Sequence, residues 1–451
     1  MKKKTFAKIL STMMIATCLT ACQGGNTPEQ APAAASATPT EATQNGNAEL
    51  EGTLVFALWD NVSIELFESM DLEGRFQKLY PKANIEFEKL KDDSEYWNAM
   101  KVRASANQLP DIMYNKTFTL SRFQDYLLDL STTEAVKNNN IAEGYRLNGK
   151  ILGIPEKMTC EYVYYWKDMF KEAQVEVPTT WTQFEEVAKK LQAYYGSSNP
   201  NFSAIAIGGK DEWPTYPFVE FMPALISGNG QNWNTMSTQD EPFAEGTDIY
   251  KAYQKIHSLF QSGAFGKDPL GIGNDQATAL FAQQQSAILA SGGWALANIK
   301  EGANSIDNLG TFYLPVRDSE SEPFRTITQG DSFLSVTSSS KNPELAKAFV
   351  EFYFSDAWYP DYINAITDDN TMKTVTKEKD PVLAEADTLQ PNKELVMYDG
   401  GGDNFTALVS ATTFDYKKLG AEMLIKGYDL NSTLAELNAK WKAARQSLNI
   451  Q

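Results

Sequence analysis

The 451-residue chain has 58 acidic and 40 basic side chains, a formal net charge of −18, and a single histidine. Such an acidic chain is unsuited to binding nucleic acid or an anionic membrane face. One histidine also excludes a histidine-based metal cluster and gives little support to Ser-His-Asp catalysis. We therefore expect no metal, no cofactor and no catalytic residues.

The first 21 residues have the pattern of a secretory signal. A lysine-rich start over residues 2–8 precedes an apolar stretch over residues 9–21, which is too short to span a bilayer. The stretch ends in "LTAC", which resembles the bacterial lipobox, in which the cysteine is acylated and becomes the mature N-terminus. We predict a lipoprotein signal peptide over 1–21 and a lipid on Cys22.

Residues 22–51 have the composition of a disordered tether. Leu50 is the only large apolar residue between residues 23 and 51, so this Ala/Pro/Thr/Gln/Gly-rich segment cannot bury enough surface to offset its chain entropy. A flexible chain of about 28 residues reaches roughly 30 Å. We therefore expect a globular body held by its lipid at the extracellular face of the cell membrane, or on the periplasmic side if the source has an outer membrane.

About 400 residues follow the tether, which is enough for two domains of ordinary size. Short apolar runs alternate with amphipathic helical patterns, and this alternation predicts an α/β architecture. The expected strands cover residues 53–58, 83–90, 111–114, 160–166, 203–208, 286–291, 309–315 and 332–337.

Two helices have clear start signals. Thr180 and Gln183 have the spacing of a capping box, and the apolar stripe that follows consists of Trp181, Phe184, Val187, Ala188 and Leu191. Thr433 and Glu436 have the same spacing near the C-terminus, which predicts a last helix beginning there and docking on its own domain.

Three tryptophans stand beside polar turns at the ends of predicted strands. Trp59 is followed by Asp60 and Asn61, Trp213 lies in "GGKDEWPTYP", and Trp294 follows "ASGG". Strand ends at the openings of α/β sheets are common ligand sites. Sugars stack their C–H faces on such rings and need polar partners for their hydroxyls. The pattern therefore favours carbohydrate binding.

Several segments in a fixed order resemble one protein family. They are "LPDIMY" (109–114), "NGKILGIP" (148–155), "YYWKDMFKEAQVEVPTTW" (164–181), "FAQQQSAILASGGWALANI" (281–299) and "SFLSVTSSSKNPELAKAFVEFYFS" (332–355). In order and spacing they are similar to the extracellular solute-binding proteins of sugar ABC importers, across nearly all of residues 50–451.

The resemblance implies a two-lobed fold of the type II periplasmic-binding-protein kind, with a ligand cleft between lobes joined by crossover strands. It assigns residues 52–158 and about 326–395 to lobe 1, and residues 159–325 and about 396–451 to lobe 2. It further implies a monomer whose lobes close on the ligand and which then docks on the permease subunits of an ABC transporter.

The resemblance also implies a set of ligand-binding positions. Trp213 and Trp294 correspond to stacking aromatics, and Thr159 stands where the family has a carboxylate. Asp331 and Asp403 are expected in the cleft from their loop positions alone. The full expected set is Trp59, Asp60, Asn61, Asn115, Thr159, Trp213, Trp294, Asp331 and Asp403.

The function that follows is capture of a carbohydrate, with an oligosaccharide favoured, and its delivery to the transporter, without turnover. Two alternatives stay open at this point. One is a binding protein of the same fold for another solute, such as a polyol phosphate or a peptide. The other is a secreted lipoprotein glycosidase, because the spatial separation of a carboxylate pair is not visible in sequence.

The segment "EYVYYWKDMF" (161–170) is expected to be scaffold close to the hinge. Val163, Tyr165 and Phe170 are predicted to pack inside, while Tyr162 and Tyr164 point the other way along the strand, nearer the cleft. The role of Trp166, which stands where the family usually has Asn, is left open.

Overall fold

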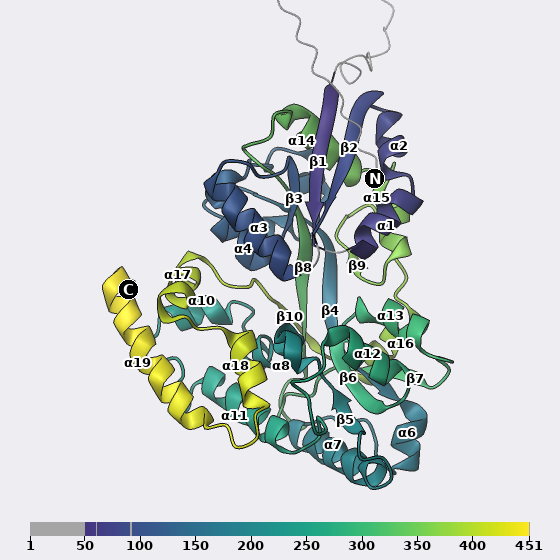
Figure 1. The fold of residues 1–451 in the computed structure, drawn as a ribbon, viewed down its shortest axis with the longest axis vertical. Helices are drawn as coiled ribbons and strands as arrows, with labels where there is room; N and C mark the ends of the chain where they lie inside the picture. The colour runs from purple at the N-terminus through teal and green to yellow at the C-terminus, as the bar shows by residue number, and fades with distance from the viewer. Residues whose placement is uncertain (1–49, 60, 91–92, 451) are drawn as a thin grey trace, which may run out of the picture. The chain divides into compact units, whose positions relative to one another are not determined.

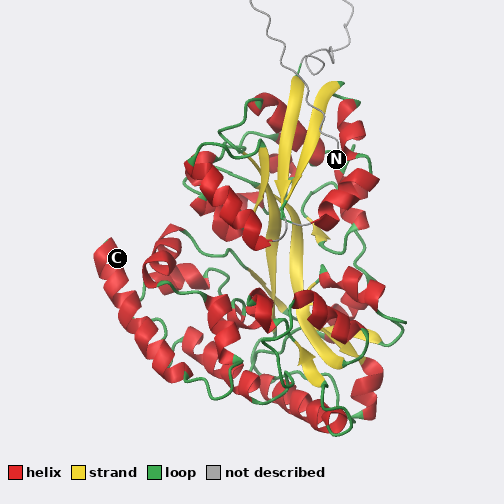
Figure 2. Cartoon of the chain, viewed as in Figure 1, coloured by secondary structure: helices red, strands yellow, loops and turns green. Residues whose placement is uncertain are grey.

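The structure, a computed structural model, describes residues 50–59, 61–90 and 93–450 (Figure 1). The predicted signal peptide, Cys22 and the tether up to residue 49 lie outside these residues. In the described part of the chain, no helix combines the length and hydropathy needed to cross a membrane. Helices and strands alternate in a mixed α/β architecture, as predicted (Figure 2).

The first hydrophobic core surrounds three parallel strands, β1 (Glu51–Leu58), β2 (Lys82–Lys89) and β3 (Ile112–Asn115). Phe56 in the middle of β1 is fully buried and packs on Phe67 and Phe349, with ring centroids 6.0 and 5.9 Å away. The helices around these strands are α1 (Asn61–Ser69), α2 (Leu72–Gln77), α3 (Asp93–Ser105), α4 (Thr117–Arg122), α5 (Glu134–Asn138), α14 (Pro343–Tyr353) and α15 (Tyr359–Ala365).

The second core is built on β5 (Ser203–Ala206), β6 (Ser286–Gly292) and β7 (Leu309–Phe312). Its helices are α6 (Lys167–Glu172), α7 (Trp181–Gly196), α8 (Tyr216–Val219), α9 (Met222–Ser227), α10 (Asn232–Ser237), α11 (Asp248–Gln261), α12 (Asn274–Ala282), α13 (Ala295–Gly302), α16 (Pro381–Leu389), α17 (Asp403–Thr412), α18 (Tyr416–Met423) and α19 (Leu430–Leu448). The strands of the first lobe also border a smaller cluster that includes Tyr96 and Met100 of α3 and Leu120 of α4. Because neither cluster of this lobe shares residues with the second core, the chain has two lobes.

Two long antiparallel strands, β4 (Ile154–Trp166) and β8 (Arg325–Val336), pass from one core to the other (Figure 1). Ile154 and Leu334 lie in the first core, whereas Tyr164 and Ile327 lie in the second. The strand order β2-β1-β3-β8-β4-β6-β5 makes these two strands the centre of the sheet. Side chains on their middle portions are therefore positioned where the two lobes meet.

All eight predicted strands are present, but the two crossing strands are longer than predicted. β4 begins at residue 154 instead of 160, and β8 at 325 instead of 332. The missed parts are rich in polar residues and lack the apolar runs on which the prediction relied. Two short strands, β9 (Asp369–Asn370) and β10 (Glu394–Met397), were not predicted and pair with β4 and β8 respectively.

The helix start signals were right in one case and displaced in the other. Thr180 and Gln183 form the predicted capping box, and the whole predicted stripe of α7 is buried. The last helix begins earlier than predicted, because Asp429 is its N-cap and accepts a 3.1 Å hydrogen bond from the backbone N–H of Ser432. Thr433 therefore lies inside α19 and does not cap it.

The helix α16 packs with the second core. Leu383 and Ala386 of α16 are buried there, and α16 packs on β7. The lobe boundaries inferred from the resemblance, near residues 326 and 395, stay a prediction. The apolar face of this short helix fits either core, so only packing decides its place.

The five rings of the segment at the end of β4 are all interior. Val163, Tyr165 and Phe170 are buried, as predicted. Tyr162 and Tyr164, expected nearer the cleft, are buried too. The ring of Trp166 stacks 5.4 Å from a buried phenylalanine, and its Nε1–H donates a 2.7 Å hydrogen bond to a backbone carbonyl. Trp166 is therefore a core residue.

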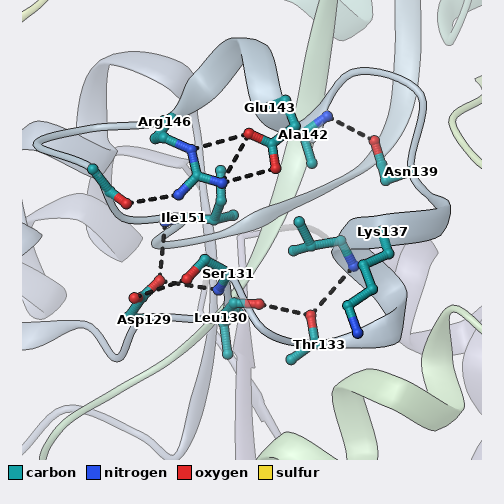
Figure 3. A network of polar contacts seen from close by, with 12 residues as sticks. Asp129, Leu130, Ser131, Thr133, Lys137, Asn139, Ala142, Glu143, Arg146 and Ile151 are labelled. Atoms are coloured by element: carbon teal, nitrogen blue, oxygen red, sulfur yellow. Dashed lines mark hydrogen bonds and ion pairs between the residues drawn. The ribbon is translucent and has the colours of Figure 1, made fainter.

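The loop that leads into β4 is held by its own polar contacts (Figure 3). The carboxylate of Asp129 accepts hydrogen bonds from the backbone N–H groups of Ser131, at 3.0 Å, and Ile151, at 3.1 Å. Arg146 forms a forked pair with Glu143 at 2.8–3.0 Å. These bonds fix the approach of the chain to the first crossing strand.

Candidate functional site

A polar row runs along one face of β4 in the region between the two cores. Lys157, Thr159 and Glu161 alternate along the strand, so their side chains share a face. On β8, Asp331 lies opposite Lys157, and Gln329 lies opposite Thr159. We call Lys157, Thr159 and Glu161 the β4 row. It gives this face both charges and neutral hydrogen-bonding groups.

Beside the row stand two partly exposed tryptophans, Trp213 and Trp294, which we call the aromatic pair. Their ring centroids are 5.9 Å apart, and Trp213 also lies 6.1 Å from the ring of Tyr216. Trp213 begins a short 3-10 turn after β5, and Trp294 precedes α13. Gly292, opposite Glu161, allows this approach, because a Cβ there would collide with the indole nitrogen of Trp294.

Glu161 is tied to the aromatic pair through Tyr216. The hydroxyl of Tyr216 donates a 2.7 Å hydrogen bond to Glu161 Oε2 and accepts a 2.9 Å bond from the backbone N–H of Gly292. Burial raises the pKa of Glu161 to about 8, against the opposing effect of the Tyr216 hydrogen bond. A carboxyl at this position therefore carries a proton near neutral pH.

Three buried side-chain oxygens near this face have no hydrogen-bond partner in the described residues. They are the hydroxyl of Thr159, Oδ1 of Asp368 and Oδ1 of Asn370, which lies opposite Lys157 on β9. Thr159 is 3 % exposed and Asp368 is 5 % exposed. The second carboxylate oxygen of Asp368 lies 3.8 Å from Lys157 Nζ. Buried polar atoms normally have partners, so these oxygens leave hydrogen-bonding capacity unused on this face.

A second aromatic group lies on the first-lobe side. The rings of Trp59 and Trp97 lie 5.6 Å apart, and Trp59 also packs on buried Tyr114 at 5.2 Å. Lys116 lies over Trp59, with Nζ 5.0 Å from the ring centroid, and its ammonium is 3.9 Å from Asp331. Asp331 thus links this group to the β4 row.

The predicted ligand residues do not all share one environment. The structure brings Trp213, Trp294 and Thr159 together, and it places Asp331 beside Lys116. Asn115 is fully buried; its Nδ2–H donates to Ser335 Oγ at 3.0 Å, and its Oδ1 accepts from the Thr119 hydroxyl at 2.8 Å, so these two contacts lie inside the first lobe.

Asp403 lies at the start of α17 with an exposed carboxylate, 3.5 Å from Gln124 Nε2. Its observed contact is therefore with the first lobe. Asp60 lies outside the described residues. Asn61 begins α1, and its side chain is outside the described part as well. Cys22, the predicted lipid site, is also outside.

Sequence reasoning missed several polar groups of this face, namely Lys157, Glu161, Lys116 and Tyr216. Glu161 and Lys157 were visible as charges alternating with apolar residues at the start of a strand pattern, a signal that places them on one face. Tyr216 carried no such signal, because its relation to Glu161 depends on the packing of α8 against β4.

A family model for bacterial extracellular solute-binding proteins matches residues 65–360 of this chain. The chain belongs to this family. The multiple sugar-binding protein of Streptococcus mutans is 22% identical over 342 residues, covering 72% of this chain and 78% of the relative. Maltodextrin-binding protein MdxE of Bacillus subtilis is 21% identical over 304 residues, covering 64% of this chain and 69% of the relative.

Solved structures of solute-binding proteins share the fold. RafE in complex with raffinose has a TM-score of 0.72 at 22% identity, covering 87% of this chain and all of that chain (100%). A manno-oligosaccharide-specific solute-binding protein of Bifidobacterium animalis subsp. lactis, in complex with mannotriose, has a TM-score of 0.73 at 18% identity, covering 90% and 97%. The predicted two-lobed α/β fold is confirmed.

Proposed function

We propose that this solute-binding protein captures an oligosaccharide and delivers it to the permease of an ABC transporter. The observation that carries the proposal is the aromatic pair, Trp213 and Trp294, beside the β4 row. Two partly exposed rings offer flat apolar surface to the C–H faces of a sugar, and the row offers donors and acceptors to its hydroxyls. The names of the relatives, which mention multiple sugars, maltodextrin, raffinose and mannotriose, support the same class.

Binding at this place engages both lobes. The β4 row and the aromatic pair belong to the crossing strand and the second core, whereas Trp59 and Lys116 belong to the first. A ligand that contacts both sides favours the arrangement in which the lobes meet around it, and the permease would recognise that arrangement. Trp59, Thr159 and Asp331 remain in the proposed contact set.

The charges of the site favour a neutral ligand over a phosphate. Lys116 and Lys157 each lie within 4 Å of a carboxylate, at Asp331 and Asp368 respectively. Anion sites use cations that are free to pair with the ligand, often as an arginine cluster. A polyol phosphate therefore fits less well than a sugar.

The proposal extends to where the protein works. We propose that the chain is exported, acylated at Cys22 and held as a monomer at the outer face of the cell membrane, with the predicted segment 22–51 as its tether. The lipobox-like "LTAC" and the basic, short apolar start support this. Mass spectrometry of the membrane fraction would detect the acylated Cys22 peptide, and Cys22→Ala would release the protein from the membrane.

The test of the binding function is calorimetry with raffinose, stachyose, mannobiose, mannotriose, maltotriose and a chitin oligosaccharide. Trp294→Ala and Trp213→Ala are each expected to weaken binding of a panel sugar by about 1–3 kcal/mol, or roughly 5- to 150-fold, the scale of a lost aromatic anchor. Tyr194→Ala is the matched control, because this ring is 51 % exposed on α7 and should leave affinity unchanged. The absence of heat with every sugar, or an undiminished affinity in both tryptophan variants, would refute the proposal.

A further inference from the structure

Glu161 has an unusual hydrogen-bonding position for a carboxyl in a binding site. Because Tyr216 accepts the backbone N–H of Gly292, its own hydroxyl hydrogen is directed to Glu161 Oε2, at 2.7 Å. The other oxygen, Oε1, makes no hydrogen bond to any described residue. One half of the carboxyl is thus held by Tyr216, whose ring lies 6.1 Å from that of Trp213 in the aromatic pair, and the other half keeps its hydrogen-bonding capacity.

The charged and titratable groups around Glu161 are mostly acidic. Glu220, next to α8, and two aspartates, Asp368 before β9 and Asp331 on β8, all disfavour a negative charge on it. Among the described residues, only Tyr216 on α8 forms a hydrogen bond with the Glu161 carboxyl. Lys157, on the same strand, lies within 4.0 Å of Asp368, and among the described residues no lysine or arginine forms an ion pair with Glu161.

Burial and this acidic surrounding act in the same direction. Burial is the larger cause and the three carboxylates add to it, and together they outweigh the Tyr216 bond, so the pKa of Glu161 is about 8. The protonated carboxyl has an O–H that can donate, which a carboxylate lacks. Tyr216 already donates to Oε2, so the acid proton is most favourably placed on Oε1.

We propose that Glu161 binds the solute as a neutral carboxylic acid, donating a hydrogen bond from Oε1 to an oxygen of an uncharged, hydroxylated ligand that lies on Trp213 and Trp294. This inference rests on the proposed function and narrows its ligand class. A ligand with an ammonium group would need the carboxylate, and a ligand with an acidic group would meet three neighbouring carboxylates. The proton remains on Glu161 throughout, so no bond is broken.

The proposal makes ligand affinity depend on pH in one direction. Below about pH 7 the carboxyl is protonated in the free protein, and affinity is constant. Above the pKa of about 8, binding must first take up one proton, so the apparent dissociation constant rises by about tenfold between pH 7 and pH 9. A cationic ligand would show the opposite slope.

The test is calorimetry of raffinose and mannotriose, or of whichever panel sugar binds, at pH 6, 7 and 9. At pH 9 the titration is repeated in two buffers that differ in ionisation enthalpy, which reports the proton taken up. Glu161→Gln should bind within about threefold of wild type at pH 6 and lose most of the pH dependence, because its amide N–H replaces the acid O–H. Glu161→Ala should bind at least tenfold more weakly at pH 6.

The matched control is Glu172→Gln, which changes another carboxyl that accepts a tyrosine hydrogen bond, from Tyr195 at 2.8 Å, on the exposed surface of α6. It should keep the wild-type pH dependence. A wild-type affinity that is flat from pH 6 to 9, or a Glu161→Gln variant that keeps the full slope, overturns the inference while sugar binding stands. A panel in which no sugar binds at any pH overturns the proposed function itself, and this inference with it.

Discussion

The carboxylate of Glu156 is the acceptor for three tyrosine hydroxyls in the first core. Glu156 and the three tyrosines are fully or almost fully buried, with at most 1 % of each exposed. Tyr353 donates to Oε2 and Tyr362 to Oε1, each at 2.6 Å, and Tyr114 also donates to Oε2. Replacing Glu156 by Ala removes every one of these acceptors at once and leaves a cavity on β4.

The cost of Glu156→Ala follows from the count of orphaned groups. A buried hydroxyl left without a partner costs about 1–3 kcal/mol. The hydroxyl oxygens of Tyr114 and Tyr353 lie 3.4 Å apart, so these two hydroxyls can hydrogen-bond to each other. About two hydroxyl hydrogens then remain without an acceptor. With the cavity added, we expect a loss of about 3–5 kcal/mol in the free energy of unfolding. Glu156→Gln keeps one carbonyl acceptor and should lose only about 1–2 kcal/mol.

The difference in unfolding free energy between wild type and Glu156→Gln should also vary with pH. Burial raises the pKa of Glu156 above its ordinary value, against Lys157 and the three hydrogen bonds. A raised pKa in the folded state contributes stability that is present below the unfolded pKa and lost as pH rises through the folded one. The deficit of Glu156→Gln should therefore shrink as pH rises.

Urea unfolding at pH 5 and pH 8, followed by circular dichroism and tryptophan fluorescence, measures both effects. Glu172→Ala is the control, because it removes a single acceptor on the surface and should cost less than about 1 kcal/mol. The reasoning is refuted if Glu156→Ala unfolds within 1 kcal/mol of wild type, or no earlier than Glu156→Gln.

Two further predictions concern the second lobe. Trp166→Phe keeps a ring against Phe281 but removes the 2.7 Å indole hydrogen bond to the Phe281 carbonyl, which still accepts the backbone N–H of Gln284 at 2.9 Å. The lost hydrogen bond and the smaller ring should lower the free energy of unfolding by about 1–2 kcal/mol in urea denaturation, and no change would mean that the indole N–H contributes nothing. Asp387 is partly buried, yet hydrogen bonds from two lysines and Tyr313 hold its pKa at about 2, so its stabilisation is present above the unfolded pKa and lost as pH falls from about 4 to 2. Asp387→Asn should flatten the acid part of the plot of melting temperature against pH. The stabilisation lost is about 1 kcal/mol once solvent screening is counted. An unchanged acid part of the plot would contradict the prediction.

Local signals predicted the elements well where neighbouring residues alone determine the local structure. The capping box at Thr180 and the stripe of α7 depend only on neighbouring positions, so the sequence contained everything needed. The apolar runs of the eight strands are equally local. The crossing strands were predicted too short, because their polar halves, such as the part of β4 around Lys157, lack the continuous apolar run on which the prediction relied and are held by the pairing between β4 and β8.

By itself the sequence determined the two-lobed α/β class and the aromatic pair at strand ends, because these follow from periodicity and from an ordered set of family-like segments. Only the tertiary structure decided which polar groups accompany the pair. Tyr216 of α8 contacts Glu161 of β4, and Lys116, which follows β3, contacts Asp331 on the neighbouring strand β8. Such contacts between segments far apart in the sequence leave no pattern in the chain. The same is true of charge: Glu161 is an ordinary acid in the sequence, and folding brings to it the burial and the acidic neighbours that raise its pKa.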